Sequence, residues 1–398
     1  MKKNAKCLLT VTLTAAMLVG FGNIPSWAES TNDSASTAQT NTSDIVENTA
    51  TNDGDITIGV SIWGTNDSLG GPVKKQLDSV ADALGVKLVY VETSLKSEEV
   101  VTSIENLAAA DCDGIIVCNS ADTEMAKAIA TCEKNQVYLA QYFRQITDES
   151  VLQMANKSKY YVGCVHEDEE DNGYKLCQIL IENKGDRNIG MINYRVGDAT
   201  SMARISGYKK FAEEWNEKHP DDTVILGDVV DDKFTAEEAR QAVESMIDAN
   251  PEMDGVVVVG GGTTLEGVIN GIESKKMADK LDVVSTDFPA NLSELLESGQ
   301  ISAMSGGHYA DPYFAFMMVY NAIRGNYVKP ENGILEIKFP FMYVSSPEDY
   351  AKYDKYFVQS LPFNADDDKK IAEKSFDDLA KMAANLSIDE VEQRHGDQ

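Results

Sequence analysis

Ten polar and aromatic side chains of this sequence follow short apolar runs, at positions where a buried strand would end. They are Trp63, Asn66, Asp67, Asn119, Gln141, Arg144, Arg204, Phe234, Asp287 and His308. Carboxylates, amides and a guanidinium group match hydroxyl donors and acceptors, and aromatic faces match the C–H faces of a ring. Because ligands bind at the carboxyl ends of strands in open α/β sheets, these are the candidate ligand-binding residues.

Other site chemistry finds little support in the sequence. The four histidines have no H-E-x-x-H spacing, and no G-x-S-x-G nucleophile elbow occurs. The acidic run from His166 to Asp171 is typical of a solvated helix start, where acids complement the helix dipole. Gly260-Gly261-Gly262 resembles a phosphate-binding turn, but Leu265 replaces the third glycine of the dinucleotide pattern. We therefore expect no catalytic residue, no metal and no cofactor.

Alternating strands and helices must position the candidate residues. Apolar β-branched runs predict strands at 56–62, 86–92, 114–118, 137–141, 161–165, 188–193, 224–229, 256–259 and 283–285. Helical spacing between them predicts right-handed βαβ units in parallel sheets. Asp113–Val117 recurs as Asp254–Val258, each time before a polar loop and a helix. The expected fold is therefore α/β, with two similar Rossmann-like lobes. Residues 369–386 predict one C-terminal helix, frayed from about Asp389.

The N-terminal region indicates export. Lys2, Lys3 and Lys6 precede an apolar stretch, and small residues precede the expected cleavage point at Ala28, so residues 1–28 are predicted to be a signal peptide. An uncleaved membrane anchor stays open as an alternative. Residues 29–55 are rich in Ser, Thr and Asn, which predicts a disordered spacer. The protein is expected in the periplasm or cell envelope.

Charge and cysteine content exclude further classes. The formal net charge is −30, from 35 Lys and Arg against 65 Asp and Glu, and no basic cluster interrupts it. Such a surface repels phosphate backbones, so we expect no nucleic-acid partner. Five of the six cysteines follow the signal peptide without C-x-x-C or disulfide-framework spacing, so most are expected to be buried thiols.

Six segments in order resemble the ribose/galactose-binding family of type I periplasmic binding proteins, the substrate-binding components of sugar ABC transporters. They are ITIGVSIWGTND, DGIIVCNSAD, TSMARISGYKKF, KFTAEEARQAVESMI, DGVVVVGGGTTLEGVINGI and VVSTDFP. The resemblance covers about residues 56–344 and implies two lobes joined by a multi-strand hinge. The implied N-terminal lobe is 56–164 plus 308–337, and the C-terminal lobe is 165–307 plus 338–346. Residues 347–398 are left as a partly helical extension.

The same resemblance implies sugar-contacting positions at Asn66, Asn119, Arg204, Phe234 and Asp287. Arg204 and Asp287 would pair with sugar hydroxyls, and Trp63 or Phe234 would stack on the ring. The family's Asp-Arg pair is replaced by Gln141-Tyr142 with Arg144 beyond, its Asn-Asp pair by Gly261-Gly262, and its late Gln or Asn falls near His308. These departures leave a smaller polyol, a signalling molecule or another polar metabolite open as the ligand.

The implied function is that of a monomeric solute-binding protein, not an enzyme, which closes on a monosaccharide and delivers it to an ABC permease. Two alternatives stay open. In one, the closed lobes engage a membrane receptor or histidine kinase instead of a permease. In the other, a secreted α/β enzyme uses Asp287 and His308. Repressors of this fold need an N-terminal helix-turn-helix, and here a signal peptide and spacer are expected in its place.

Overall fold

The computed structural model describes residues 45–47, 56–231 and 233–396. Contacts along the chain separate a first unit, residues 1–42, from a second unit, residues 43–398. The expected signal peptide and most of the expected spacer fall outside the described residues. In the part of the chain that the structure describes, no helix has both the length and the apolar character of a membrane span.

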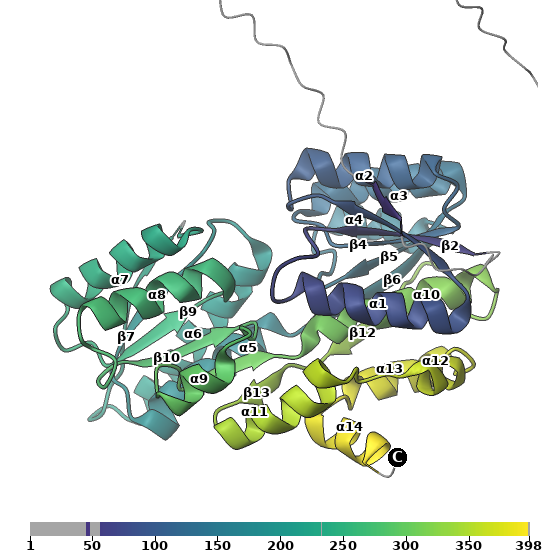
Figure 1. Cartoon of the computed structure of the whole chain (residues 1–398). Coiled ribbons are helices and arrows are strands. Elements are labelled where there is room, and N and C mark those ends of the chain that lie inside the picture. The colour runs from purple at the N-terminus through teal and green to yellow at the C-terminus, as the bar shows by residue number, and fades with distance from the viewer. Residues whose placement is uncertain (1–44, 48–55, 232, 397–398) are drawn as a thin grey trace, which may run out of the picture. The chain divides into compact units, whose positions relative to one another are not determined.

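Seven strands form the sheet of the first lobe, in the order β1-β3-β2-β4-β5-β6-β12 (Figure 1). They are β1 (Ile45–Glu47), β2 (Thr57–Ile62), β3 (Lys87–Glu92), β4 (Gly114–Val117), β5 (Tyr138–Tyr142), β6 (Tyr161–Glu167) and β12 (Leu335–Phe339). All neighbours are parallel except β1, which pairs antiparallel with the edge strand β3. The sequence predicts a disordered spacer over residues 29–55, but three residues of that segment form strand β1. The backbone of the edge strand β3 pairs with them.

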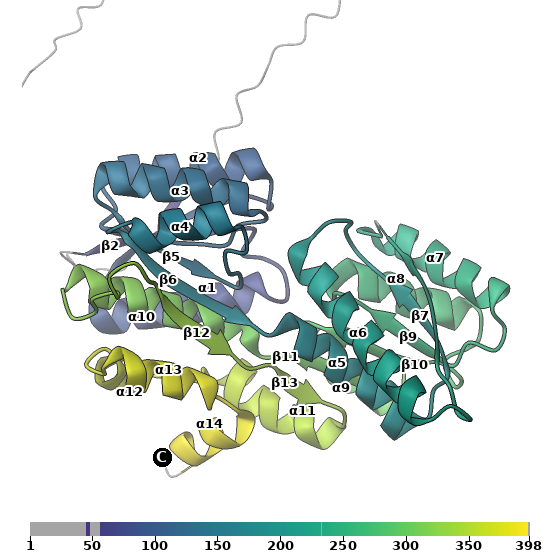
Figure 2. The same ribbon diagram turned by 180° about the vertical axis from the view of Figure 1, so that it is seen from behind.

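Helices cover both faces of this sheet. One face carries α2 (Ser97–Ala109), α3 (Asp122–Asn135) and α4 (Glu149–Lys157), and the other carries α1 (Gly70–Leu84) and α10 (Asp311–Ile323) (Figures 1 and 2). A central strand such as β4 is therefore buried on both sides, which explains its continuous apolar sequence.

Six strands form the sheet of the second lobe, in the order β13-β11-β10-β9-β7-β8. They are β7 (Asn188–Ile192), β8 (Ile225–Val230), β9 (Gly255–Val258), β10 (Asp282–Thr286), β11 (Ala303–Gly306) and β13 (Met342–Val344), the last antiparallel to β11. Its helices are α5 (Glu169–Gln178), continued by η1 (Ile179–Lys184), α6 (Ala199–Lys218), α7 (Ala236–Ala249), α8 (Gly262–Ser274) and α9 (Leu292–Glu297). The pair α5 and α6 lies on one face of the sheet, and α7 and α8 lie on the other (Figures 1 and 2).

The chain crosses between the two sheets three times. It leaves β6 after Glu167 and enters α5, returns from β11 through Gly307 and η2 (His308–Ala310) into α10, and passes from β12 to β13 after Phe339. The first and third crossings lie up to three residues beyond the expected boundaries at Cys164 and Lys338, because β6 and β12 pair in parallel to their ends. The candidate residues lie around these crossings.

The C-terminal segment 347–396 is a series of short helices. They are α11 (Pro347–Tyr353), η3 (Asp354–Gln359), α12 (Ala365–Ile371), α13 (Phe376–Ala384) and α14 (Ile388–His395). The expectation of one helix over 369–386 is wrong, because the Ser375 side chain caps a new helix by accepting a hydrogen bond from Asp378 N. The expected frayed end is wrong too, since Ser387 caps α14 in the same way.

Candidate functional site

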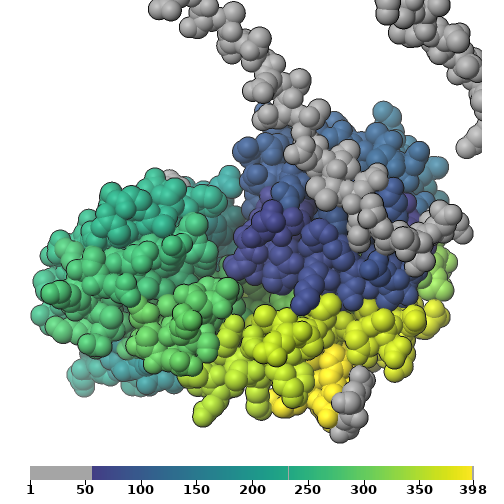
Figure 3. Space-filling model, in the orientation of Figure 1, coloured from purple at the N-terminus to yellow at the C-terminus, as the bar shows by residue number. Residues whose placement is uncertain are grey.

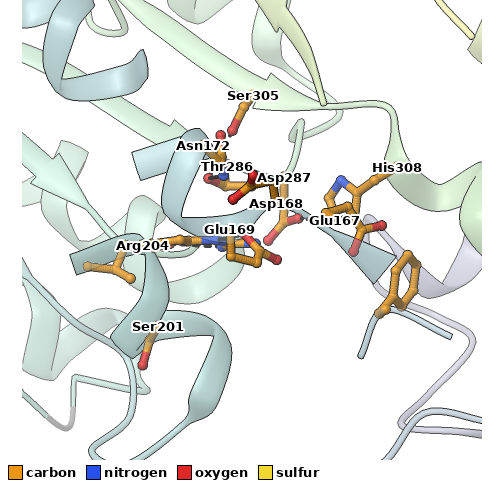
Figure 4. A network of polar contacts seen from close by, with 12 residues as sticks. Glu167, Asp168, Glu169, Asn172, Ser201, Arg204, Thr286, Asp287, Ser305 and His308 are labelled. Carbon is orange, nitrogen blue, oxygen red and sulfur yellow. Dashed lines mark hydrogen bonds and ion pairs between the residues drawn. The ribbon is translucent and has the colours of Figure 1, made fainter. Parts of the chain in front are cut away.

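Expected site residues meet where strands of both sheets end. Trp63 follows β2, Arg144 follows β5, Asp287 follows β10, and His308 follows β11 at the second crossing. Arg204 reaches the same region from the first turns of α6 (Figure 4). The place matches the edge at which open α/β sheets bind ligands.

Arg204 is held by a carboxylate of its own lobe. Its Nε donates to Glu169 Oε2 at 2.6 Å, its Nη2 donates to Glu169 Oε1 at 3.0 Å, and its Nη1 donates to the Val259 carbonyl at 2.9 Å. The Arg204 side chain is 5% exposed and the Glu169 side chain 11%. Glu169 belongs to the acidic run that the sequence assigns to a solvated helix start. The structure corrects that assignment for Glu169, because its carboxylate is the buried counter-ion of Arg204.

Asp287 and His308 form the ion pair closest to the second crossing. His308 Nε2 lies 3.2 Å from Asp287 Oδ1, and the His308 side chain is 4% exposed. Burial alone would raise the pKa of Asp287, but His308 and Arg204 hold that pKa below its ordinary value. Burial alone would lower the pKa of His308, but Asp287 raises it above the ordinary value. Asp287 also has φ = 74°, in the left-handed region that is uncommon for non-glycine residues.

Two buried carboxyl groups, Glu167 and Asp311, lie beside this ion pair. Glu167 ends β6 and Asp311 begins α10, so both flank crossings between the lobes. Burial raises the pKa of both groups; Glu167 raises the pKa of Asp311 further, whereas Asp311 holds the pKa of Glu167 lower than burial alone would. Asp311 accepts the backbone N–H of Phe143 at 3.3 Å, which holds Phe143 in a left-handed backbone with φ = 58°. Glu167 belongs to the acidic run that the sequence assigns to a solvated helix start, and its burial corrects that assignment. Sequence reasoning missed Asp311, since its pairing with Glu167 spans residues far apart in the chain.

Aromatic rings line this region in a continuous row. The Trp63 ring lies 5.7 Å from that of Phe143, Phe143 lies 5.3 Å from His308, and His308 lies 4.8 Å from Phe341. Phe341 also lies 5.8 Å from the Arg204 guanidinium. Phe143 and Phe341 were not expected in the site, although each directly follows a strand or crossing segment, the same signal that indicated Trp63.

A cavity of about 440 Å³ opens beside these residues. Phe143 and Arg144 line it from the first lobe, Thr200 and Ala203 line it from α6, and the crossing segment 166–170 lies between them. This volume falls in the usual range for small-molecule sites. Among the described residues, the Arg144 guanidinium donates a hydrogen bond to the Phe143 carbonyl alone, at 2.8 Å, so its other N–H groups could donate to a ligand.

Unpartnered buried polar atoms gather in this cluster. Within the described part of the chain, His308 Nδ1 and both carboxylate oxygens of Glu167 are buried and have no hydrogen-bond partner, and Asp287 Oδ1 has the His308 Nε2 contact at 3.2 Å. Such atoms are uncommon in native proteins, because an unsatisfied buried polar group costs free energy. Their concentration at the ends of strands indicates a site built for a polar ligand.

Other expected residues lie elsewhere or have their groups occupied. Gln141 is fully buried, with its amide between Asn119 and the Tyr161 hydroxyl. Asn119 also donates to the Ala121 carbonyl, so this pair is a polar contact inside the first lobe. Asp67 accepts the Trp63 indole N–H and two backbone N–H groups at the start of α1.

Two further expected residues lie at the surface. The Phe234 side chain is 66% exposed and stacks on no other ring of the described residues, so the ring is free for a ligand or for solvent. Asn66 is exposed as well, in the loop before α1. Among the described residues, no group of three or more His, Cys, Asp or Glu side chains is arranged to hold a metal ion.

Comparison with solved structures supports the fold. An ABC transporter periplasmic solute-binding protein from Actinobacillus succinogenes 130z, solved with bound D-allose, is 18% identical with a TM-score of 0.63, and the match covers 75% of this chain and 100% of that one. An ABC transporter solute-binding protein from Bacillus halodurans C-125, with bound myo-inositol, is 18% identical with a TM-score of 0.62, covering 76% and 98%. A glucose-galactose binding protein from Geobacillus stearothermophilus is 18% identical with a TM-score of 0.61, covering 74% and 98%.

Sequence comparison gives the family directly. No curated protein sequence matches this chain. A family model described as a periplasmic binding protein domain matches residues 58–326, a range that runs from β2 to β6 in the first lobe and from β7 to β11 in the second. With the two-sheet α/β fold and the site at the strand ends, the chain belongs to the periplasmic binding protein domain family.

Proposed function

We propose that this protein is an extracytoplasmic solute-binding protein that closes on a monosaccharide between its lobes and delivers it to an ABC importer. The family is one of binding proteins outside the cytoplasm. Neighbouring structures at 17–18% identity hold D-allose, tagatopyranose or myo-inositol, which makes sugars and polyols the first ligands to test. The predicted signal peptide would direct export and would be cleaved near Ala28.

The observation that carries this proposal is the group of buried polar atoms on His308 and Glu167 that have no hydrogen-bond partner among the described residues, next to the Asp287–His308 ion pair. A carboxylate accepts and a protonated imidazole donates, and a hydroxyl group can do both. The row from Trp63 to Phe341 adds aromatic faces beside these polar atoms. Polar atoms flanked by aromatic faces match a molecule with hydroxyls at its edge and C–H groups on its faces.

The mechanism rests on unequal ligand contacts in two states. Arg144 belongs to the first lobe and Asp287 to the second, so a ligand that touches both favours the state in which the lobes are close. The ligand shifts the equilibrium only by its difference in affinity for the two states. A permease that recognises the closed state then receives the loaded protein.

A thermal-shift screen of the full chain tests the proposal. The panel is D-allose, D-tagatose, D-glucose, D-galactose, L-arabinose and myo-inositol. A ligand at 100 times its Kd adds about 2.7 kcal/mol of stability, which raises Tm measurably. We expect one or two panel members to raise Tm, and Asp287→Ala to abolish the rise without abolishing the folding transition. Wild-type protein that shows no rise with any panel member at 10 mM would overturn the monosaccharide assignment.

A further inference from the structure

The C-terminal segment 347–396, here named the strap, contacts both lobes. Against the first lobe, α12 packs on α1, and α13 packs on β12 and α10. Against the second lobe, α11 packs on α9 and β13. In Figure 3 the yellow strap runs along the purple first lobe and meets the green part of the second lobe. The match to the family model ends at residue 326, before the strap begins.

Four aromatic rings carry the contact from one lobe to the other. Phe288 of the second lobe lies 4.7 Å from Tyr353, edge to face. Tyr353 stacks on Phe357 at 5.1 Å with an interplanar angle of 10°. Phe357 lies 6.3 Å from Tyr309, and the Tyr309 hydroxyl donates to the Phe357 carbonyl at 2.7 Å. This row, here named the aromatic bridge, is buried at Tyr353, Phe357 and Tyr309.

Both ends of the aromatic bridge adjoin the site. Phe288 directly follows Asp287, and Tyr309 directly follows His308. The Phe288 ring packs on Gly306 so closely that a Cβ there would lie 2.8 Å from it, so the ring also fixes the end of β11. The strap therefore contacts the residue that follows each member of the Asp287–His308 ion pair: Phe288 after Asp287, and Tyr309 after His308.

We propose that the strap is a positioning element, which holds Asp287 against His308 and limits hinge bending between the lobes through the aromatic bridge. Lobes of one chain move relative to each other by default unless a large apolar interface joins them. The buried rings of the strap provide such an interface on the side of the crossings. The strap therefore keeps the site assembled before a ligand arrives, which lowers the ordering cost of binding.

Two measurements on the ligand-free full chain test this inference, so their outcome does not depend on the proposed sugar. The first is the His308 pKa by NMR, assigned with His308→Asn. Asp287 raises this pKa, and Glu167 and Glu169 add to the effect, while burial opposes it. The second is the distance distribution between spin labels at Ala130→Cys and Ser245→Cys, one on each lobe, in a Cys7→Ser background. The other five cysteines are buried and should not take the label.

Phe357→Ala removes the centre of the aromatic bridge, and Phe363→Ala is its matched control. Phe363 is also a fully buried strap ring, but its ring neighbours among the described residues are Tyr313 and Phe314 of the first lobe, and the Arg394 guanidinium over it belongs to the strap itself. We expect Phe357→Ala to lower the His308 pKa, because Asp287 would no longer be held against the imidazole, and to broaden the distance distribution. We expect Phe363→Ala to change neither.

Equal effects of the two variants would overturn the inference, since loss of any strap ring would then act through stability alone. An unchanged His308 pKa and an unchanged distribution in Phe357→Ala would overturn it as well. If Phe357→Ala does not fold, Phe357→Leu and Tyr353→Leu reduce the ring stacking while keeping apolar volume. Unchanged His308 pKa and distance distribution in these variants would then overturn the inference.

Discussion

The buried ion pair between Arg204 and Glu169 can be tested against an exposed pair of the same two helices. That exposed pair joins Lys210 to Glu170, the residue next to Glu169. Glu169 and Glu170 both lie in the first turn of α5, and each pairs with a basic residue of α6. The Arg204–Glu169 side chains are 5% and 11% exposed, whereas those of Lys210 and Glu170 are 53% and 44% exposed. Glu→Gln at the two positions therefore makes the same chemical change near the same helix dipole and differs mainly in burial.

Glu169→Gln leaves the Arg204 charge buried without its counter-ion. Removing one partner of a buried ion pair costs about 3–5 kcal/mol, while an exposed pair contributes about 0–1 kcal/mol. We expect Glu169→Gln to lower the free energy of unfolding by about 3 kcal/mol or more. We expect Glu170→Gln to lower it by less than about 1 kcal/mol. Urea titrations followed by circular dichroism measure both values.

A double variant separates pairing from other effects of the substitution. Glu169→Gln with Arg204→Met leaves no buried charge, so it should be less destabilised than the sum of the two single variants. Equal losses for Glu169→Gln and Glu170→Gln would refute the reasoning, because burial would then not govern the cost. A double variant as unstable as that sum would refute the buried pair itself.

Two further predictions concern titration. Burial raises the pKa of Glu167, so this group contributes stability that is present below the ordinary glutamate pKa of about 4.3 and is lost as the pH rises through the higher folded value. Glu167→Gln should therefore flatten the fall in Tm from acidic to neutral pH, and a fall as steep as that of the wild type would contradict it. Burial raises the thiol pKa of Cys112, Cys132 and Cys177 to about 12, and all five described cysteines are buried. None of these should react with Ellman's reagent at pH 8 until urea unfolds the chain, and prompt labelling of the native protein would show that a thiol is accessible.

Local sequence was sufficient for most of the fold. Runs such as Gly114–Val117 and Gly255–Val258 are apolar on both strand faces, a pattern that only a covered parallel sheet satisfies. Periodicity predicts a single C-terminal helix over 369–386 because the helical spacing of apolar residues continues across the break near Ser375. The helix starts are marked in the sequence by Ser375 and Ser387, each with an acidic residue three positions later. These capping signals locate the helix boundaries better than the apolar periodicity does.

The site was harder to predict than the fold because its contacts join distant parts of the chain. Arg204 was expected to face a ligand, but its partner Glu169 lies 35 residues away and no local pattern links the two. Gln141 followed a strand as expected, yet its amide is satisfied inside the lobe by Asn119 and Tyr161. Residue type and strand position therefore located the region, while the remaining hydrogen-bond capacity of each group could be read only from the structure.

The hydrogen bonds already made by each side chain separate the residues that build the site from those with atoms left to bind a ligand. Arg204 makes three hydrogen bonds to Glu169 and Val259, so its main contribution is to fix α5, α6 and β9 around the site and to hold the Asp287 carboxylate ionised. Asp287 Oδ1 contacts His308 Nε2 at 3.2 Å, and His308 Nδ1 has no hydrogen-bond partner among the described residues. A ligand gains most where it satisfies groups that are already desolvated, because their desolvation cost was met on folding. Recognition in this protein should therefore depend more on Asp287 and His308 than on Arg204, the reverse of what residue type alone suggests.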